Sequence, residues 1–351
     1  MLHKTFFYIC SIFILIFWSP FPSQSSENKE LVLLNWSDYM DPDLLQKFEQ
    51  KSGIHVREVY FETDETRDEL LSRTNGQGFD LAIVAANRVE NYVKQGWLVP
   101  LESQLIGNMK HIASRWLEAY SQANPYHVPL LWGTLGIAYR TDLVEEVITK
   151  WAQLLTPAER FRKHILMVKD SRDLAGIAMK ALGYSWNSED EAALQAAKTL
   201  LLAQKPFVHD YGYPSLDEKS GLVTGSTWIA TMYNGDVIAL QTFEPRIAYV
   251  VPEEGTNLWV DSLVVFEKSM QKQLAFAFID FLHEPENSAQ LAQYLHYATV
   301  NQAAENLLPQ TYRNDPTIYP PTAILSRSEF TQRISPKVES KFKNILRSLL
   351  N

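Results

Sequence analysis

Three aspartates stand where a carboxylate is costly unless it has a partner. Asp170 and Asp173 follow the apolar run 165–168, and Asp261 lies inside the apolar run 258–266. Such carboxylates could act as a general acid and base, bind a hard metal ion, or pair with the ammonium groups of a polyamine. Asp173 could instead cap a helix, with Asp170 solvated. For Asp261, inside a hydrophobic strand, a ligand cation is one partner that would satisfy the buried charge.

Aromatic residues occur near the same expected strand ends. The segment NWSDYM, residues 35–40, follows the apolar run 31–34. Aromatic faces attract ammonium groups by about 0.5 to 2 kcal/mol each, and they also pack against methylene chains. Core packing explains most aromatic residues in a chain with 12% aromatic content. The aromatic residues that could line a cation site are Trp36, Tyr39, Tyr233, Trp259 and Tyr297.

Metal and cofactor chemistry has little support in the sequence. The eight histidines form no His-x-x-x-His pair with a nearby carboxylate, and Cys10 is the only cysteine. Tyr211 and Tyr213 could supply phenolates to ferric iron, which is a weak two-residue signal. The sequence contains no G-x-S-x-G, P-loop or G-x-G-x-x-G motif. We therefore expect no metal and no cofactor, and a hydrolase with an aspartate pair is the less favoured alternative.

The elements that position these residues alternate between strand and helix. Asp41 can cap a helix with Pro42 at its first position, and Gly53 can end it. The first half reads as strands 31–35, 54–60 and 79–86 with helices 42–52, 65–72 and 89–95. The second half reads as strands 165–168, 237–240, 247–251 and 258–266 with helices 173–182, 189–204, 271–283, 285–295 and 336–350. This alternation is typical of a doubly wound α/β sheet, which binds ligands at the carboxyl ends of its strands.

The overall composition indicates a two-lobed exported protein. A chain of 351 residues with 46% hydrophobic content is long for one domain. The net charge of −9 comes without a basic stripe, which argues against nucleic acid as a partner. Lys4 precedes the apolar run 6–18, which is too short to span a bilayer, and the small residues Ser23 and Ser25 follow. Residues 1–25 are therefore expected to be a signal peptide that directs the protein to a bacterial periplasm.

Many short motifs occur in one order over almost the whole mature chain: LVLLNWSDYMDPDLLQKFEQKSGIHV, FDLAIV, VPLLWGTLGIAYRTD, DSRDLAGIAMKALGYS, YNGD, LWVDSL and YATVNQAAENLLP. Together they resemble the bacterial periplasmic spermidine/putrescine-binding proteins of ABC transporters. The resemblance implies a two-lobed periplasmic binding protein fold, type II-like, with a doubly wound sheet flanked by helices in each lobe. It places residues 26–138 plus 259–303 in the N-terminal lobe and 139–258 plus 304–351 in the C-terminal lobe. A monomer would close on a polyamine and deliver it to permease subunits in the inner membrane.

The resemblance also implies the residues of the ligand site. Aromatic rings would clamp the ligand chain, and carboxylates would hold its amines. Carried over by motif, these residues are Trp36, Ser37, Tyr39, Asp170, Asp173, Trp259, Asp261 and Tyr297.

The chain departs from the family pattern at three places. Ala85 and Asn87 stand where the family usually has a Ser and a Tyr, and Asn87 could restore one polar contact. Tyr233 stands where a Trp is expected. The family has a Gln near the C-terminal helix, and Thr331 or Gln332 could take its role here. The loss of the Ser and the Tyr removes polar contacts at one end of the expected ligand site, which we call the altered end. This change makes putrescine or a related amine more plausible than spermidine, and ferric iron or another cation is the alternative ligand.

Overall fold

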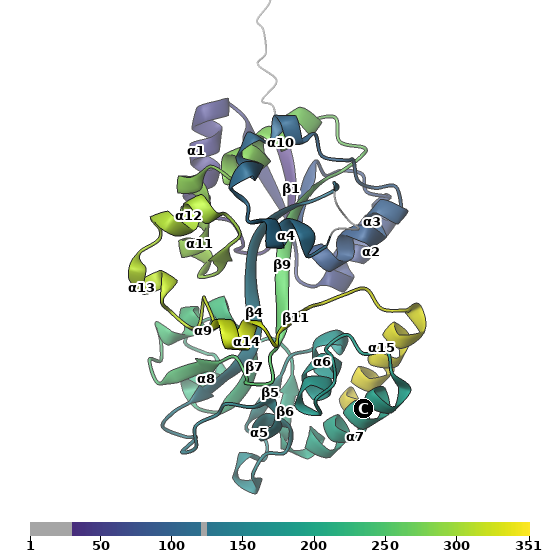
Figure 1. Cartoon of the computed structure of the whole chain (residues 1–351), viewed down its shortest axis with the longest axis vertical. Helices are drawn as coiled ribbons and strands as arrows, with labels where there is room; N and C mark the ends of the chain where they lie inside the picture. Colours follow the sequence, from purple (N-terminus) through teal and green to yellow (C-terminus); the bar gives the residue numbers. More distant parts are fainter. Residues whose placement is uncertain (1–29, 121–124) are drawn as a thin grey trace, which may run out of the picture.

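The computed structural model describes residues 30–120 and 125–351, which form two α/β lobes (Figure 1). The expected signal peptide at residues 1–25 lies outside this range. No helix in the described ranges is long and apolar enough to cross a membrane. The expectation of a two-lobed α/β fold is confirmed.

The N-terminal lobe contains a mixed sheet in the order β2-β1-β3-β9-β4. β1 and β2 are parallel, and β9 runs antiparallel to β3 and β4. Apolar side chains are buried on both faces of this sheet, beneath flanking helices. Its strands are β1 (Glu30–Trp36), β2 (His55–Phe61), β3 (Leu81–Ala85), β9 (Asn257–Val265) and the short β10 (Ala298–Thr299). Its helices are α1 (Pro42–Ser52), α2 (Asp64–Thr74), α3 (Val89–Lys94), α4 (Ser114–Glu118), α10 (Lys272–Leu282), α11 (Pro285–Leu295), α12 (Gln302–Leu307) and α13 (Gln310–Arg313).

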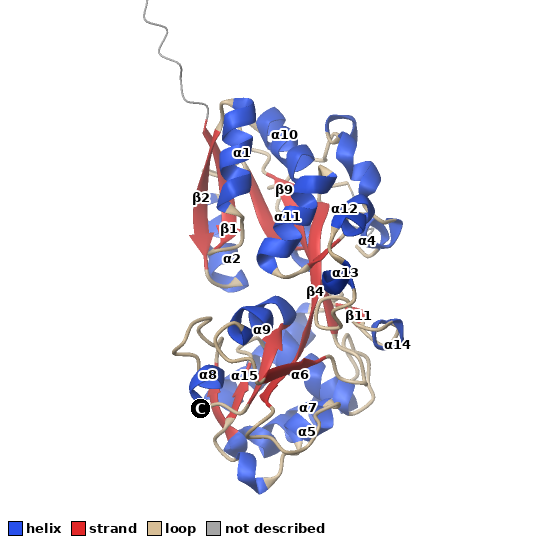
Figure 2. Cartoon of the chain, turned by 90° about the vertical axis from the view of Figure 1, so that its left-hand side faces the viewer, coloured by secondary structure: helices blue, strands red, loops and turns tan. Residues whose placement is uncertain are grey.

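The C-terminal lobe continues the sheet in the order β4-β7-β5-β6, with β8 also paired to β4. Helices again cover both faces (Figure 2). Its strands are β5 (Ile165–Met167), β6 (Val208–Tyr211), β7 (Ile229–Tyr233) and β8 (Ile247–Val250). Its helices are α5 (Trp151–Leu155), α6 (Ser171–Ala181), α7 (Glu191–Gln204), α8 (Gly221–Thr224), α9 (Asn234–Gln241) and α15 (Pro336–Leu350).

Three segments connect the lobes. The long strand β4 (Val128–Arg140) pairs with β9 through its first half and with β7 and β8 through its second half. The second connecting segment is the start of β9, where Asn257 and Leu258 pair with β11 (Glu329–Phe330). The third is the stretch that reaches β11 after the short helix α14 (Thr322–Leu325). Figure 1 shows β4 and β9 running side by side from one lobe into the other. The sheet is therefore continuous through the connection between the lobes.

The expected division of the chain at 138/139, 258/259 and 303/304 stays a prediction. Ala304 and Leu308 pack together beside α11, and Ile318 belongs to the core of the N-terminal lobe. This packing favours a third crossing closer to β11 than to residue 303.

The expected strand 237–240 is wrong. Those residues lie in α9, where Val237 and Leu240 are buried and the side chains between them are half-buried. The spacing of three places both side chains on one helical face, and so short an apolar run does not distinguish helix from strand by periodicity.

Candidate functional site

A cleft of about 670 Å³ lies between the two lobes. Strand ends and the helices that follow them supply its walls: the ends of β1 and β3 from the N-terminal lobe, and the ends of β5 and β7 from the C-terminal lobe. The cleft is lined by eleven of the twelve side chains named from the sequence: Trp36, Tyr39, Asn87, Asp170, Asp173, Tyr233, Trp259, Asp261, Tyr297, Thr331 and Gln332.

Ser37 is the one named residue that the structure does not bring into the cleft. Its side chain is exposed, and its hydroxyl donates a 3.3 Å hydrogen bond to Asp38 Oδ2. Asp38 adopts a positive φ of 56°, so the backbone turns sharply between Trp36 and Tyr39. This turn directs the two aromatic rings to the cleft and leaves the two polar residues outside.

Asp261 is paired with Tyr39 at the N-terminal side of the cleft. The Tyr39 hydroxyl donates a 2.7 Å hydrogen bond to Asp261 Oδ2. Burial raises the pKa of Asp261 to about 6, although this hydrogen bond acts in the opposite direction. No cationic side chain among the described residues forms an ion pair with Asp261, so the structure offers this carboxylate only a neutral donor.

Asp173 forms a second pair of the same kind with Tyr233 on the opposite wall. The Tyr233 hydroxyl donates to Asp173 Oδ2 at 2.9 Å, and Asn257 Nδ2 lies 3.4 Å from Oδ1. Burial and then the charge of Asp170 raise the pKa of Asp173 to about 8. Asp173 also lacks an ion-paired cation within the described part of the chain. A dication in the cleft could therefore find one open carboxylate on each side.

Asp170, rather than Asp173, caps helix α6. Asp170 Oδ1 accepts hydrogen bonds from the backbone N–H groups of Arg172 at 2.7 Å and Asp173 at 2.9 Å. The alternative in which Asp173 caps the helix is wrong, because Asp173 is already in the first turn. The cap fixes the start of α6 after β5, and it turns Asp173 inward to a buried position with 5% exposure.

A row of aromatic rings joins the two carboxylate pairs. Tyr39 lies 5.9 Å from Tyr297 between ring centroids, and Tyr297 packs edge-on against Trp259 at 4.7 Å. Trp259 is 6.2 Å from Tyr233, which stacks on Tyr213 at 6.4 Å. The wall between Asp261 and Asp173 is thus apolar and electron-rich, which suits methylene groups and ammonium groups alike.

A third tyrosine–aspartate pair lies behind this row, and the sequence did not predict it. Tyr297 OH donates to Asp236 Oδ1 at 3.2 Å. Burial raises the pKa of Asp236 to about 6. Asp236 is not one of the residues that line the cleft, so its charge acts on the site through Tyr297. Asp236 ends the YNGD motif, but nothing in that motif indicates that α9 packs against Tyr297.

The altered end of the cleft lies where β3 leaves the sheet. Ala85 is the register partner of Asp261, so the position where the resemblance implies a serine lies beside that carboxylate. Asn87 lines the cleft, and its buried Oδ1 has no hydrogen-bond partner among the described residues. Thr331 Oγ1 donates to Asn257 Oδ1 at 2.7 Å, while the backbone oxygen of Gln332 accepts from Arg172 Nη2 at 2.6 Å. Thr331 therefore fixes the amide that contacts Asp173.

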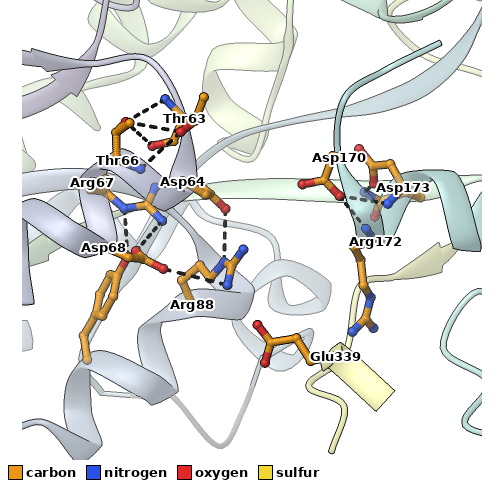
Figure 3. A network of polar contacts seen from close by, with 12 residues as sticks. Thr63, Asp64, Thr66, Arg67, Asp68, Arg88, Asp170, Arg172, Asp173 and Glu339 are labelled. Carbon is orange, nitrogen blue, oxygen red and sulfur yellow. Dashed lines mark hydrogen bonds and ion pairs between the residues drawn. The ribbon is translucent and has the colours of Figure 1, made fainter. Parts of the chain in front are cut away.

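A charged network on the N-terminal wall was also missed. It consists of Asp64, Arg67 and Asp68 on α2 and Arg88 in the 3-10 turn η1 (Ala86–Arg88), and Figure 3 shows it opposite Asp170 and Arg172. We call it the α2–η1 network. Arg67 is fully buried and donates to Asp64 Oδ1 at 2.6 Å and Asp68 Oδ1 at 3.1 Å. No local motif marks such a network, because its residues come from α2 and η1, which meet only in the folded chain.

Tyr211 and Tyr213 do not share a site in the structure. Tyr213 lines the cleft and stacks on Tyr233, whereas Tyr211 is not among the lining residues. The Tyr211 hydroxyl is buried without a partner in the described chain. Within the described ranges, histidine, cysteine, aspartate and glutamate form no group of three that could hold a metal ion.

Comparison with known proteins gives one consistent family. The model of the bacterial extracellular solute-binding protein family matches residues 43–320. The chain is 27% identical over 310 residues to the spermidine/putrescine-binding periplasmic protein of Salmonella typhimurium, covering 88% of each protein. It is 27% identical over 320 residues to the putrescine/cadaverine-binding protein of Pseudomonas aeruginosa, covering 88% of this chain and 89% of the relative. A spermidine/putrescine ABC transporter substrate-binding protein from Streptococcus pneumoniae superposes with a TM-score of 0.81 at 27% identity, covering 92% of this chain and 98% of that one.

Proposed function

Because the chain belongs to the bacterial extracellular solute-binding protein family, we propose that it captures a linear polyamine between its lobes and delivers it to an ABC transporter permease. The names of its relatives support a periplasmic location and a polyamine as ligand. We further propose that it acts as a monomer after removal of a signal peptide.

The observation that carries this proposal is the pair of buried carboxylates without an ion-paired cation among the described residues. Asp173 and Asp261 are 5% and 9% exposed, and each accepts a hydrogen bond from a tyrosine hydroxyl. A buried carboxylate is stabilised most by a cation that also donates hydrogen bonds. An alkylammonium group supplies both, and its methylene chain matches the aromatic row between the two acids. A diamine would therefore neutralise both carboxylates in one binding event.

The named residues take distinct roles in this proposal. Asp173 and Asp261 bind the two ammonium groups, and Asp170 adds negative charge beside Asp173. Asn87 and Gln332 offer polar contacts at the altered end. Thr331 acts indirectly, through Asn257. The walls that contact the methylene chain are Trp36, Tyr39, Tyr233, Trp259 and Tyr297.

The arrangement of acids favours binding over hydrolysis. Asp170 uses one carboxylate oxygen to cap α6, and Asp173 is held by Tyr233. An enzyme would need one acid and one base directed at the same substrate atom. The two open carboxylates instead stand on opposite walls with aromatic rings between them. The separation of Tyr211 from the cleft likewise gives no support to a ferric-iron site.

The test is a calorimetric titration of the mature protein, which is first unfolded and refolded to remove any bound ligand. The ligands are putrescine, cadaverine, spermidine and spermine. One-to-one binding of at least one of them with micromolar or tighter affinity is the expected result. No heat with any of the four, from protein with a native circular dichroism spectrum, would overturn the proposal.

A further inference from the structure

The carboxylates of the α2–η1 network are already occupied by arginine side chains. Asp64 accepts from Arg67 through Oδ1 at 2.6 Å and from Arg88 Nε through Oδ2 at 3.1 Å. Asp68 accepts from Arg67 through Oδ1 at 3.1 Å, and its Oδ2 lies 3.8 Å from Arg88 Nη1. Tyr92 OH also donates to Asp68. Neither acid is open to a ligand ammonium as Asp173 and Asp261 are.

Arg88 carries its charge into the cleft. Its side chain is 24% exposed and lines the cleft, and Figure 3 shows it facing Glu339 and the start of α6 on the opposite wall. Burial lowers the pKa of Arg88, but the charges of Asp64, Asp68 and Asp170 outweigh this effect and hold it well above its usual range. The guanidinium is therefore a cation that Asp64 and Asp68 hold at the N-terminal wall of the cleft, and Asp170 and Glu339 lie on the facing wall.

The neighbour across the cleft is also positive. Arg172 donates through Nη2 to Asn187 and to the backbone oxygen of Gln332, and its buried Nε has no hydrogen-bond partner among the described residues. Burial lowers the pKa of Arg172, and the charge of Arg88 contributes to the same direction. A second cation entering this region would meet two guanidinium groups, while the acids of the α2–η1 network are already paired.

From these contacts we infer that Arg88 restricts the ligand to a diamine, because its guanidinium occupies the position between the lobes that a third ammonium group would need. This inference rests on the proposed function, since it assumes that Asp173 and Asp261 bind the first two ammonium groups. Arg88 thus supplies the positive charge that the third ammonium group of a triamine would otherwise bring. Putrescine and cadaverine match the two open carboxylates, whereas the third ammonium group of spermidine would enter a part of the cleft that already holds the Arg88 guanidinium.

Three variants separate the charge of Arg88 from its bulk. Arg88→Gln keeps most of the side-chain length and removes the charge, Arg88→Lys keeps the charge, and Lys343→Gln is the matched control. Lys343 also lines the cleft and pairs with Glu339 at 3.1 Å, so its loss changes the net charge of the cleft equally from the other wall. Each protein is titrated with putrescine, with spermidine and with 4-aminobutyrate under the same buffer and salt.

The wild-type protein should bind putrescine more tightly than spermidine. Arg88→Gln should strengthen spermidine binding by about 10- to 100-fold and change putrescine binding less than about threefold, because like-charge juxtaposition in a desolvated site is strongly unfavourable. Arg88→Lys and Lys343→Gln should keep the wild-type preference. An Arg88→Gln variant that keeps the full wild-type preference for putrescine would overturn the inference, as would a wild-type protein that binds spermidine as tightly as putrescine.

Three further outcomes would each count against the inference in a different way. Tighter binding of 4-aminobutyrate than of putrescine would show that the two arginines receive a carboxylate, which overturns the inference. Equal losses of both diamine and triamine binding in Arg88→Gln would assign Arg88 a structural role and exclude it as a determinant of chain length. If the wild-type protein and all variants bind none of these amines, the proposed function itself has failed.

Discussion

The Tyr39 hydroxyl and the Asp261 carboxylate are 2.7 Å apart, although 222 positions separate them in the sequence. Tyr39 follows the end of β1, and Asp261 lies in β9 beside the end of β3. The bond joins the segment that turns into the cleft with the strand that crosses between the lobes. An ionised carboxylate beside a neutral donor remains under-neutralised, which is the property that a ligand cation requires.

Asp261→Asn tests the role of this carboxylate in binding. Asn keeps the shape of the side chain and removes the charge, so the ligand ammonium loses its ionic partner. Truncating one side of a buried charge pair costs about 2 to 5 kcal/mol, equivalent to about 30-fold to several-thousand-fold in affinity. Calorimetric titration with the best polyamine should show this loss. The exposed Asp38→Asn variant, which alters a charge near Tyr39 outside the cleft, should bind as the wild type does.

The melting temperature separates a binding role from a structural one. Burial raises the pKa of Asp261 to about 6, so the ligand-free fold gains nothing from its ionisation. Asp261→Asn should therefore melt within a few degrees of the wild type. Loss of the folded state in this variant would contradict the account and make Asp261 a structural residue.

Ligand binding should release protons near neutral pH. In the ligand-free protein the pKa of Asp173 is about 8 and that of Asp261 about 6, both raised chiefly by burial. At pH 7 Asp173 is mostly protonated and must ionise to bind an ammonium group, so about one proton should leave per ligand bound. Affinity should rise as the pH increases through about 6 and then about 8. Titrations in buffers of different ionisation enthalpy measure the released proton directly.

Asp173→Asn is the control for this linkage. It removes the group with the higher pKa, so proton release at pH 7 should nearly disappear along with much of the affinity. Full proton release from Asp173→Asn would assign the titration to another group.

Arg67 should contribute strongly to stability. It is fully buried, and it holds Asp64, Asp68 and Tyr92 through hydrogen bonds. Arg67→Leu leaves two carboxylates without their buried partner and should cost about 3 to 5 kcal/mol in the free energy of unfolding. Urea denaturation checks this value. Arg57→Ala, which removes an exposed pair with Glu30, should cost less than about 1 kcal/mol. Equal costs would show that the network adds no more than a surface pair.

Gly133 in β4 should be required for the position of Trp259. A Cβ at residue 133 would stand 2.2 Å from Trp259 Cζ2 and 2.4 Å from Asn234 Oδ1, so the indole must shift. Gly133→Ala should cost about 1 to 3 kcal/mol by overpacking and weaken ligand binding through the displaced ring. Chemical denaturation and titration measure the two effects. Gly107→Ala meets no atom within 4 Å and should leave both unchanged; unchanged binding in Gly133→Ala would contradict the proposed role of Trp259.

The sequence was most informative where local signals agreed. The Asp41 cap, Pro42 and Gly53 predicted α1 almost to the residue, because each carries its own backbone preference. The apolar runs predicted β1, β3 and β9, and eleven of the twelve side chains named through the family resemblance line one cleft. Ser37 lies outside the cleft because Asp38 adopts a positive φ, which no motif in the sequence indicates.

The remaining features depend on contacts between distant segments. The strand expected at 237–240 is helix α9, since four apolar residues fit either structure. The Asp236–Tyr297 pair requires the start of α9 to lie against Tyr297, and the α2–η1 network requires α2 to lie beside η1. Neither residue set has a fixed spacing, so only the folded chain brings them together.

A crystal structure of the protein with putrescine tests the central claim most directly. We expect one diamine in the cleft, with one nitrogen within hydrogen-bond distance of Asp261, the other within the same distance of Asp173, and the methylene chain against Trp259. Arg88 should stay bonded to Asp64. A diamine bound elsewhere, or bound in the cleft without contact to either carboxylate, would contradict the account.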